Sequence, residues 1–215
     1  PVFAADFVRY VGEPIAAVAA DHPETCRRAL AAIKVEYEIL QPLTDAELAL
    51  LPSTPPIHPD GNVIRRQQIV TGDQNLQGEI IVEGVYEVGM QDQAFLGLEA
   101  ALALPDSGGA GVEMFVATQW LHEDQKQIAA CLDLPIDKVR ITLGGVGGAF
   151  GAREDISLQV HCALLALRTS RPIKMQYGRE ESFYGHVHRH PAKIFIRHHA
   201  TRSGEIQRIE AKLLF

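Results

Sequence analysis

A glycine-rich segment contains the residues of this chain that are best suited to binding a ligand. Residues 144–151 hold five glycines in eight positions, with Phe150 among them. A β-branched run precedes the segment at 139–143 and a long apolar run follows from Asp155, which predicts the order strand, glycine loop, helix. Glycines let backbone N–H groups approach a ligand closely, and the start of a helix adds partial positive charge. The chemistry expected here is the binding of an anionic group such as a phosphate.

Two common phosphate-binding patterns do not fit this loop. A G-x-G-x-x-G pattern that starts at Gly145 requires glycine where Phe150 stands, and no Lys-Ser or Lys-Thr pair follows any of the glycines. One interpretation is that the glycines only permit close packing of strand against helix. The large aromatic side chain favours a wall against a flat ligand instead. Glu154 is expected in the first helical turn, where it would stabilise the helix dipole or accept a hydrogen bond from a ligand.

A second group of residues with possible chemistry is a histidine cluster. His186, His188 and His190 alternate, so on a strand all three imidazoles would point to one face and could bind zinc. No cysteine or carboxylate of suitable spacing stands beside them, and we therefore expect no zinc there. The cysteines are far apart, which leaves no spacing for zinc or an iron–sulfur cluster and indicates buried thiols of a reducing compartment. They are Cys26, Cys131 and Cys162.

The first part of the chain predicts a small α/β layer followed by a linker. Strands are expected at 15–18 and 34–39, with a helix between them whose N-cap is Asp21. Residues 50–77 are rich in proline and glycine and lack periodicity, which is typical of a linker crossing the surface.

The rest of the chain predicts a mixed sheet and two helices. Residues 100–104 and 112–117 form an expected hairpin, and Gln119 stands at its end, where a glutamine is most often solvated. A helix is expected at 122–132, followed by Asp133 in the left-handed conformation. Further strands are expected at 79–88, 173–177, 192–199 and 206–214.

The composition is that of a soluble globular chain. It has 215 residues, of which 47% are hydrophobic and 22% charged, and its net charge of −7 argues against nucleic acid as a main partner. Neither a long apolar span nor a signal peptide is apparent, so we expect a cytoplasmic protein without a membrane partner. Because the chain begins with Pro1 and ends with Phe215 inside an apolar run, we expect a piece of a longer protein.

Two motifs together resemble a known family. Ala117-Thr-Gln119 and Gly147-Gly-Ala-Phe-Gly-Ala-Arg-Glu154 resemble the signature of the molybdopterin-binding subunit of the xanthine dehydrogenase and aldehyde oxidase family, in letters and in spacing. That signature is Thr-Gln after a strand and then Gly-Gly-x-Phe-Gly-Gly-Lys-Glu. Within that family, the chain resembles the molybdenum subunit of a bacterial multi-subunit xanthine dehydrogenase. Further similar stretches are Tyr10-Val-Gly-Glu-Pro-Ile-Ala-Ala-Val18, Val35-Glu-Tyr-Glu38 and Arg189-His-Pro191.

The chain also departs from the family pattern. Ala152 and Arg153 stand in place of the usual glycine and lysine, which puts the detailed loop conformation in question. Gln93, Gly97 and Leu98 replace the usual histidine, glutamate and proline, so no role is assigned to residues 91–99.

The resemblance implies an α+β fold with a definite domain order. Residues 1–50 would be the C-terminal part of a hammerhead domain, 51–78 a linker, and 79–215 the N-terminal half of a molybdopterin-binding domain. Gln119 would donate an amide hydrogen bond toward an oxo ligand of molybdenum. Gln119 and Phe150 would surround the metal without being direct ligands. The implied cofactor-binding residues are Gln119, Gly148, Ala149, Phe150 and Gly151.

The resemblance also implies an activity for the parent protein. It would hydroxylate an electron-poor carbon of a purine such as hypoxanthine or xanthine, with Glu154 contacting the purine ring. Electrons would pass to iron–sulfur clusters and FAD in other domains or subunits. The catalytic base belongs to the family's later half, so no catalytic residue is expected in this chain. The alternatives are a hydroxylase of aldehydes or other N-heterocycles, or a non-catalytic phosphate- or nucleotide-binding module.

Overall fold

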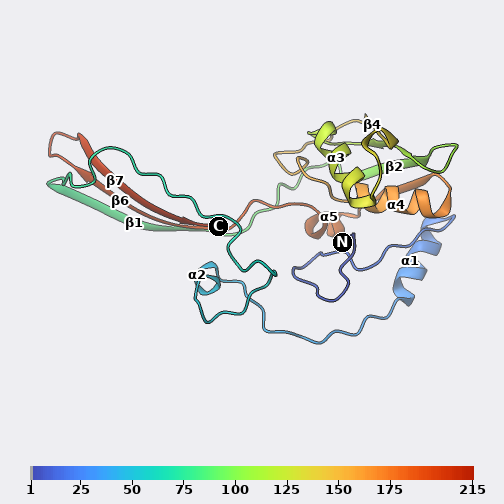
Figure 1. The fold of residues 1–215 in the computed structure, drawn as a ribbon, viewed down its shortest axis with the longest axis horizontal. Coiled ribbons are helices and arrows are strands. Elements are labelled where there is room, and N and C mark those ends of the chain that lie inside the picture. The colour runs from blue at the N-terminus through green and yellow to red at the C-terminus, as the bar shows by residue number, and fades with distance from the viewer. Residues whose placement is uncertain (1) are drawn as a thin grey trace. The chain divides into compact units, whose positions relative to one another are not determined.

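The computed structural model describes residues 2–215 and divides into two compact units (Figure 1). The first unit combines the residues up to Tyr37 with Asp92–His188, and the second combines Glu38–Gln91 with Arg189–Phe215. Each unit is therefore assembled from two separate stretches of the chain. Within residues 2–215, no helix has the length and apolar character that crossing a membrane requires.

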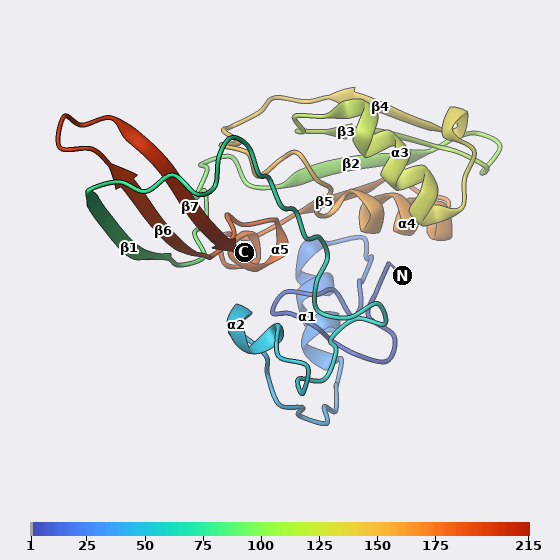
Figure 2. The same ribbon diagram turned by 60° about the vertical axis from the view of Figure 1, so that its left-hand side comes forward.

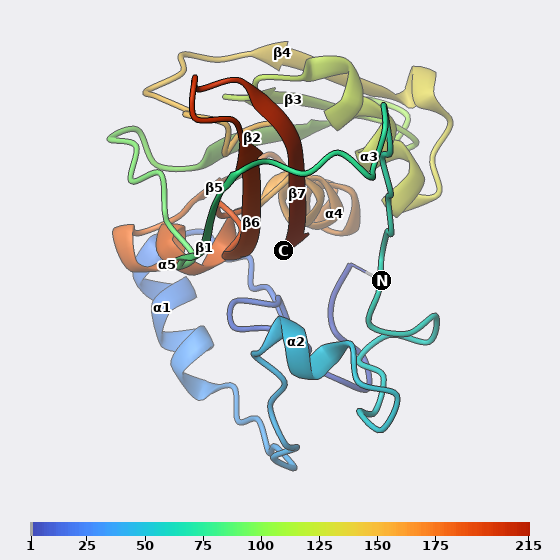
Figure 3. The ribbon, with the colours of Figure 1, turned by 90° about the vertical axis from the view of Figure 1, so that its left-hand side faces the viewer.

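The first unit is built on a four-stranded sheet with the order β4-β3-β2-β5. Strand β2 pairs antiparallel with both β3 and β5, whereas β3 and β4 run parallel. Parallel neighbours require a crossover, and helix α3 supplies it. Helices α3 and α4 pack against the sheet and against each other (Figures 2 and 3). The elements are β2 (Ala100–Pro105), β3 (Val112–Val116), α3 (Leu121–Leu132), η1 (Ile136–Lys138), β4 (Val139–Leu143), α4 (Gln159–Thr169) and β5 (Ile173–Gln176).

The core of this unit lies between the sheet and the two helices. Alternate residues of β3 are buried while Glu113 and Phe115 point away, as expected of a sheet covered on one face. Small side chains on β2 and α4 let the helix lie close to the strand. The buried apolar cluster comprises Ala101, Ala103, Val112, Met114, Val116, Ile128, Ala129, Val139, Leu158, Val160, Cys162, Ala163 and Ala166.

The second unit contains a three-stranded antiparallel sheet with the order β1-β6-β7 (Figure 1). Its strands are β1 (Ile80–Val88), β6 (Ala192–Ala200) and β7 (Ile206–Leu214), and a short helix, α2 (Ala46–Ala49), begins at Asp45. Arg197 on the central strand forms ion pairs with Glu83 on β1 at 2.8 Å and with Glu210 on β7 at 3.5 Å. Most residues of β1 and β7 are exposed.

The first fifty residues differ from the sequence prediction in their strands. The predicted helix is confirmed as α1 (Pro23–Ala32), although its N-cap is His22, whose Nδ1 accepts a hydrogen bond from the Glu24 N–H at 3.1 Å. The predicted strands at 15–18 and 34–39 are wrong, because neither segment pairs with another part of the described chain. Residues 51–79 contain no helix or strand, only an isolated bridge between His58 and Gly61.

Two further predictions were wrong, at the ends of helices. Helix α4 begins at Gln159, so Glu154 lies in a turn and not in a first helical turn. Just before the helix, Gln159 Oε1 accepts a hydrogen bond from the Ser157 N–H at 2.7 Å, which stabilises the non-helical backbone there. The histidines do not lie on a strand, because residues 186–190 form a loop that follows helix α5 (Arg179–Gly185), with His186 as its C-cap. The other predicted strands are confirmed, as are α3 and the left-handed Asp133, at φ 53°.

Candidate functional site

The two motifs singled out in the sequence meet beyond the ends of the parallel strands β3 and β4. The Gly144 N–H donates to the Val116 carbonyl at 2.8 Å, which extends the pairing past the strand ends. Beyond this point, Thr118 and Gln119 contact Arg153, the residue that follows the glycine loop. Parallel strands bring their carboxyl ends to one edge of a sheet, where ligands are commonly bound.

Gln119 is tied to the loop through Arg153. The Gln119 N–H donates to the Arg153 carbonyl at 2.8 Å, and the Arg153 N–H donates back to Gln119 Oε1 at 3.3 Å. Thr118 Oγ1 donates to the same carbonyl at 3.2 Å. The carboxamide oxygen of Gln119 is therefore engaged, while its side chain is exposed and its Nε2 group has no protein acceptor within residues 2–215. The amide N–H groups are left available for a ligand.

The loop itself adopts a strained conformation that exposes Phe150. Gly148, Phe150 and Gly151 all have positive φ, at 102°, 52° and 88°. A bulky residue in this region is an outlier that the surrounding structure must stabilise. Phe150 is 77% exposed, and the N–H groups of residues 148–151 reach no acceptor in the part of the chain that the structure describes. The loop thus presents an aromatic ring together with uncommitted backbone donors.

Arg153 holds the loop from behind. Its side chain is buried, with Nε donating to the Gly148 carbonyl at 2.9 Å and Nη2 donating to the Gly97 carbonyl. Its guanidinium lies 4.3 Å above the centre of the Phe95 ring. Burial lowers the pKa of Arg153, and the Glu99 carboxylate opposes this effect. Arginine has several donors in a fixed plane, so it can bind two carbonyls at once where the family's lysine offers a single point charge.

The segment 91–99, to which the sequence assigned no role, supports the loop directly. The Gly97 N–H donates to the Gly147 carbonyl at 3.0 Å. A Cβ atom on either glycine would lie 2.7 Å from the Cα of the other. Both positions must therefore lack a side chain. No pattern within one motif could reveal this requirement, because it arises from a contact between two distant glycines.

A cavity of about 10 Å³, room for a single water molecule, is lined by residues that include Arg153, Asp155 and Gln159. By contrast, the exposed ring of Phe150 on the loop is open to an organic ligand. Glu154 is half-buried in the turn that follows.

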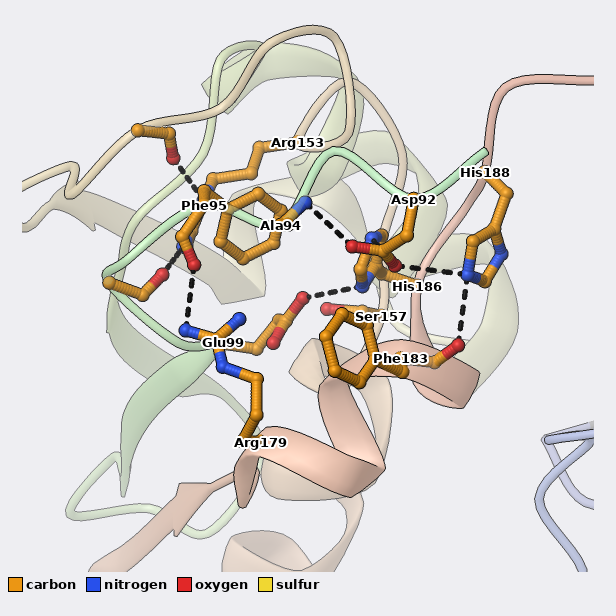
Figure 4. A network of polar contacts seen from close by, with 12 residues as sticks. Asp92, Ala94, Phe95, Glu99, Arg153, Ser157, Arg179, Phe183, His186 and His188 are labelled. Atoms are coloured by element: carbon orange, nitrogen blue, oxygen red, sulfur yellow. Dashed lines mark hydrogen bonds and ion pairs between the residues drawn. The ribbon is translucent and has the colours of Figure 1, made fainter. Parts of the chain in front are cut away.

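The histidines are placed differently from the sequence expectation (Figure 4). His186 and His188 come together with Asp92, and Glu99 also contacts His186. His190 lies outside this group and is exposed. The expectation that no carboxylate stands beside the histidines was wrong, because both acids come from the distant segment 91–99.

Comparison with known proteins identifies the family. Residues 57–215 match the molybdopterin cofactor-binding domain, and residues 1–41 match the a/b hammerhead domain of aldehyde oxidase and xanthine dehydrogenase. The chain belongs to this family. The predicted α+β fold, with a hammerhead part followed by a molybdenum-cofactor domain, is confirmed, and so is the molybdopterin-type cofactor of that domain.

Several known proteins are similar to this chain over nearly its whole length. It is 37% identical to a probable xanthine dehydrogenase subunit of Bacillus subtilis, over 100% of the chain and 29% of that protein. It is 36% identical to the nicotinate dehydrogenase large molybdopterin subunit of Eubacterium barkeri, over 99% of the chain and 51% of that protein. The aldehyde oxidoreductase of Desulfovibrio desulfuricans has the same fold, with a TM-score of 0.92 at 21% identity over 99% of the chain and 24% of that structure. The chain thus spans about half or less of these proteins.

Proposed function

We propose that this chain forms one wall of the molybdenum-cofactor site of a hydroxylase. The observation that carries the proposal is the pairing of Gln119 with the glycine loop through Arg153, which leaves a carboxamide N–H and the loop N–H groups without protein acceptors in residues 2–215. The proposed cofactor-binding residues are Gln119, Gly148, Ala149, Phe150 and Gly151. Gln119 and Phe150 would lie beside the metal without being its ligands.

The residues present fit such a cofactor. A molybdopterin-type cofactor offers oxygen acceptors, and the exposed donors of Gln119 and of residues 148–151 can bind them. Phe150 supplies an apolar surface at the same place. When bound, the group supplies a redox-active metal that takes up the electrons of the oxidised substrate. The chain's own residues would bind the group, orient it and shield one side of it from water.

The proposed domain order is a hammerhead part at 1–50, a linker at 51–78 and the first half of the molybdopterin-binding domain at 79–215. The family matches at 1–41 and 57–215 support this order. The remaining half of the domain, with the catalytic base, and the iron–sulfur and FAD domains or subunits would belong to the parent enzyme. This division is supported by the relatives, of which the chain spans 29% and 51%. We further propose a cytoplasmic location.

The proposed substrate is a purine such as hypoxanthine or xanthine, with Glu154 at the polar edge of its ring. The name of the Bacillus subtilis relative supports this class. Another N-heterocycle is the second candidate, and the nicotinate dehydrogenase of Eubacterium barkeri, at 36% identity, supports it. Both candidates are nitrogen rings, whereas an aldehyde has no ring nitrogen for Glu154 to contact.

Replacing Glu154 tests the substrate class in the intact enzyme. We expect Glu154→Ala to lower kcat/KM for xanthine about ten- to two-hundred-fold, since a hydrogen bond worth about 1–3 kcal/mol is lost, and to leave aldehyde oxidation little changed. Glu154→Gln is the matched control, because it keeps the size and one acceptor and should lose less. The comparison must be made at equal molybdenum content. Equal losses on purine and aldehyde would remove Glu154 from substrate binding.

A further inference from the structure

Three potential ligand atoms converge at the end of helix α5 (Figure 4). Asp92 Oδ2 lies 3.2 Å from His186 Nε2 and 3.1 Å from His188 Nε2, and all three atoms lie within 4.8 Å of one another. The imidazole rings of His186 and His188 are stacked, with centres 5.0 Å apart. Two imidazole nitrogens and one carboxylate oxygen form a common set of protein ligands for zinc.

The two distances from Asp92 are compatible with a tetrahedral site, and the two imidazole nitrogens lie within 4.8 Å of each other. Zinc bonds of roughly 2.0–2.1 Å to nitrogen and oxygen place neighbouring ligand atoms about 3.3 Å apart in tetrahedral geometry. The separations of 3.1 and 3.2 Å from Asp92 are close to that value. A fourth ligand would be a water molecule or the Phe183 carbonyl, which lies 2.9 Å from His188 Nε2.

Glu99 occupies the position of a supporting carboxylate. Its Oε1 lies 3.0 Å from His186 Nδ1, on the opposite side of the ring from Asp92. Metal-binding histidines almost always have such a carboxylate or carbonyl at the second ring nitrogen, which orients the ring and directs the other nitrogen to the metal. The side chains of His186 and Glu99 are 1% and 4% exposed, so this pairing is shielded from water.

Several atoms of this cluster lack a hydrogen bond of good geometry to any described residue, whereas His188 Nε2 is hydrogen-bonded to the Phe183 carbonyl. Within residues 2–215, Asp92 Oδ2, both carboxylate oxygens of Glu99 and both ring nitrogens of His186 are buried without a hydrogen bond of acceptable geometry, although they lie close together. Buried polar atoms without partners are rare and often mark an ion or water. The Asp92 side chain is 18% exposed and Glu99 is buried, and a positive charge between them would stabilise both carboxylates.

Contacts with neighbouring residues fix the proposed ligand side chains in place. Asp92 Oδ1 accepts a hydrogen bond from the Ala94 N–H at 2.6 Å, which fixes the carboxylate and leaves Oδ2 for the cluster. The Phe95 ring lies 5.0 Å from the His186 ring and covers one side. A metal here would join the end of α5 to segment 91–99, and thereby stabilise the segment in which Gly97 contacts the glycine loop.

We propose that Asp92, His186 and His188 form a structural zinc site, with Glu99 orienting His186. The competing state is a proton on His186 shared between the two acids. Burial lowers the pKa of His186, but the close contact with Glu99 and the negative charges of Glu99 and Asp92 outweigh burial and raise it. The two states differ in one measurable respect, since the zinc site takes up a metal ion and the protonated His186 does not.

Zinc binding to the intact protein distinguishes these states. The protein is treated with a chelator and titrated with Zn²⁺ against a chromophoric competitor. We expect zinc to bind in a stoichiometry equimolar with the chain, and His188→Ala to weaken binding at least tenfold. His190→Ala is the matched control, because His190 is a neighbouring exposed histidine outside the cluster, and it should bind as the wild type does. Glu99→Gln should weaken binding roughly 10- to 100-fold.

Cobalt provides a measurement that does not depend on the stability of a variant. Co²⁺ added to the chelator-treated wild-type protein should give the visible absorption bands of tetrahedral nitrogen and oxygen coordination, and Zn²⁺ should displace them. Absence of zinc uptake by the wild type, or equal uptake by the wild type and a folded His188→Ala variant, would overturn the proposal. A loss of binding in His190→Ala equal to that in His188→Ala would overturn it as well.

Discussion

At the residue scale, Arg153 connects the parts of the site. In the sequence, Arg153 stands where the family usually has lysine, and the adjacent residues do not indicate what its side chain contacts. In the structure its guanidinium reaches the carbonyls of Gly148 and Gly97, which belong to the loop and to the segment behind it. The backbone N–H and carbonyl of the same residue hold Gln119. One residue thus connects three segments that are far apart in the sequence.

Replacing Arg153 should destabilise the protein measurably. We expect Arg153→Lys to lower the free energy of unfolding by about 1–2 kcal/mol, because lysine cannot reach both carbonyls, and Arg153→Met to lower it further by leaving both carbonyls unpaired. Arg140→Met is the control, since Arg140 is exposed and forms only a surface ion pair at 3.4 Å with Glu113. Thermal denaturation of the intact protein measures the effect. If Arg153→Met lowers the free energy of unfolding no more than Arg140→Met does, Arg153 does not hold the loop.

At the element scale, the contact between Gly97 and Gly147 fixes the loop against its support. Gly97→Ala should destabilise the protein by about 1–3 kcal/mol, because the new Cβ atom would lie 2.7 Å from the Gly147 Cα and the backbone must move. Gly145→Ala is the matched control, since a Cβ atom there meets nothing within 4 Å and its φ is not positive. Thermal denaturation measures the stability of each variant, and the molybdenum content shows whether its glycine loop still binds the cofactor. Equal behaviour of the two variants would contradict the contact.

Helices α3 and α4 are joined by a buried polar pair. Asp124 on α3 is fully buried, and its Oδ2 accepts a hydrogen bond from Gln159 Nε2 on α4 at 3.2 Å. Burial raises the pKa of Asp124, and the hydrogen bond from Gln159 opposes this. A carboxyl with a raised pKa in the folded state stabilises the fold fully below the unfolded-state pKa, near 3.9, and this contribution is lost as pH rises through the folded-state value.

The isosteric change Asp124→Asn should therefore stabilise the protein at neutral pH. The amide has no charge to bury, so its melting temperature should exceed that of the wild type at pH 7, and the difference should shrink as pH falls toward about 4. Melting temperatures of both proteins across this pH range provide the measurement. A difference that does not change with pH would mean that Asp124 does not titrate with a raised pKa.

The errors in the sequence prediction also belong to the element scale. Residues 15–18 and 34–39 have apolar patterns typical of strands, but a strand exists only where a partner completes its hydrogen bonds. The non-helical backbone before α4 is stabilised by the Gln159 side chain, which periodicity does not encode. The histidines alternate in sequence, yet they lie in a loop after α5, in which two of them approach acids from a distant segment. For the strands and the histidines, the structure was decided by distant parts of the chain, which a local pattern does not encode.

At the scale of the whole molecule, the strongest sequence signal was the pair of motifs around Gln119 and Phe150. Their letters and spacing predicted the family and the fold class, and alternation and turn residues predicted the positions of most strands along the chain. The pairing of β1 with β6, and the division into two interleaved units, did not follow. These pairings join residues more than a hundred positions apart, and an exposed alternating strand does not specify its partner.

The central claim is that this chain forms a wall of a molybdenum-cofactor site in its parent protein. The most direct test is the molybdenum and pterin content of the intact protein, determined by elemental analysis and by the fluorescence of the oxidised pterin. We predict that both are present and equimolar with the chain. An intact, folded protein that contains neither and instead binds a nucleotide tightly would contradict the claim, and would identify the glycine loop as a phosphate-binding module.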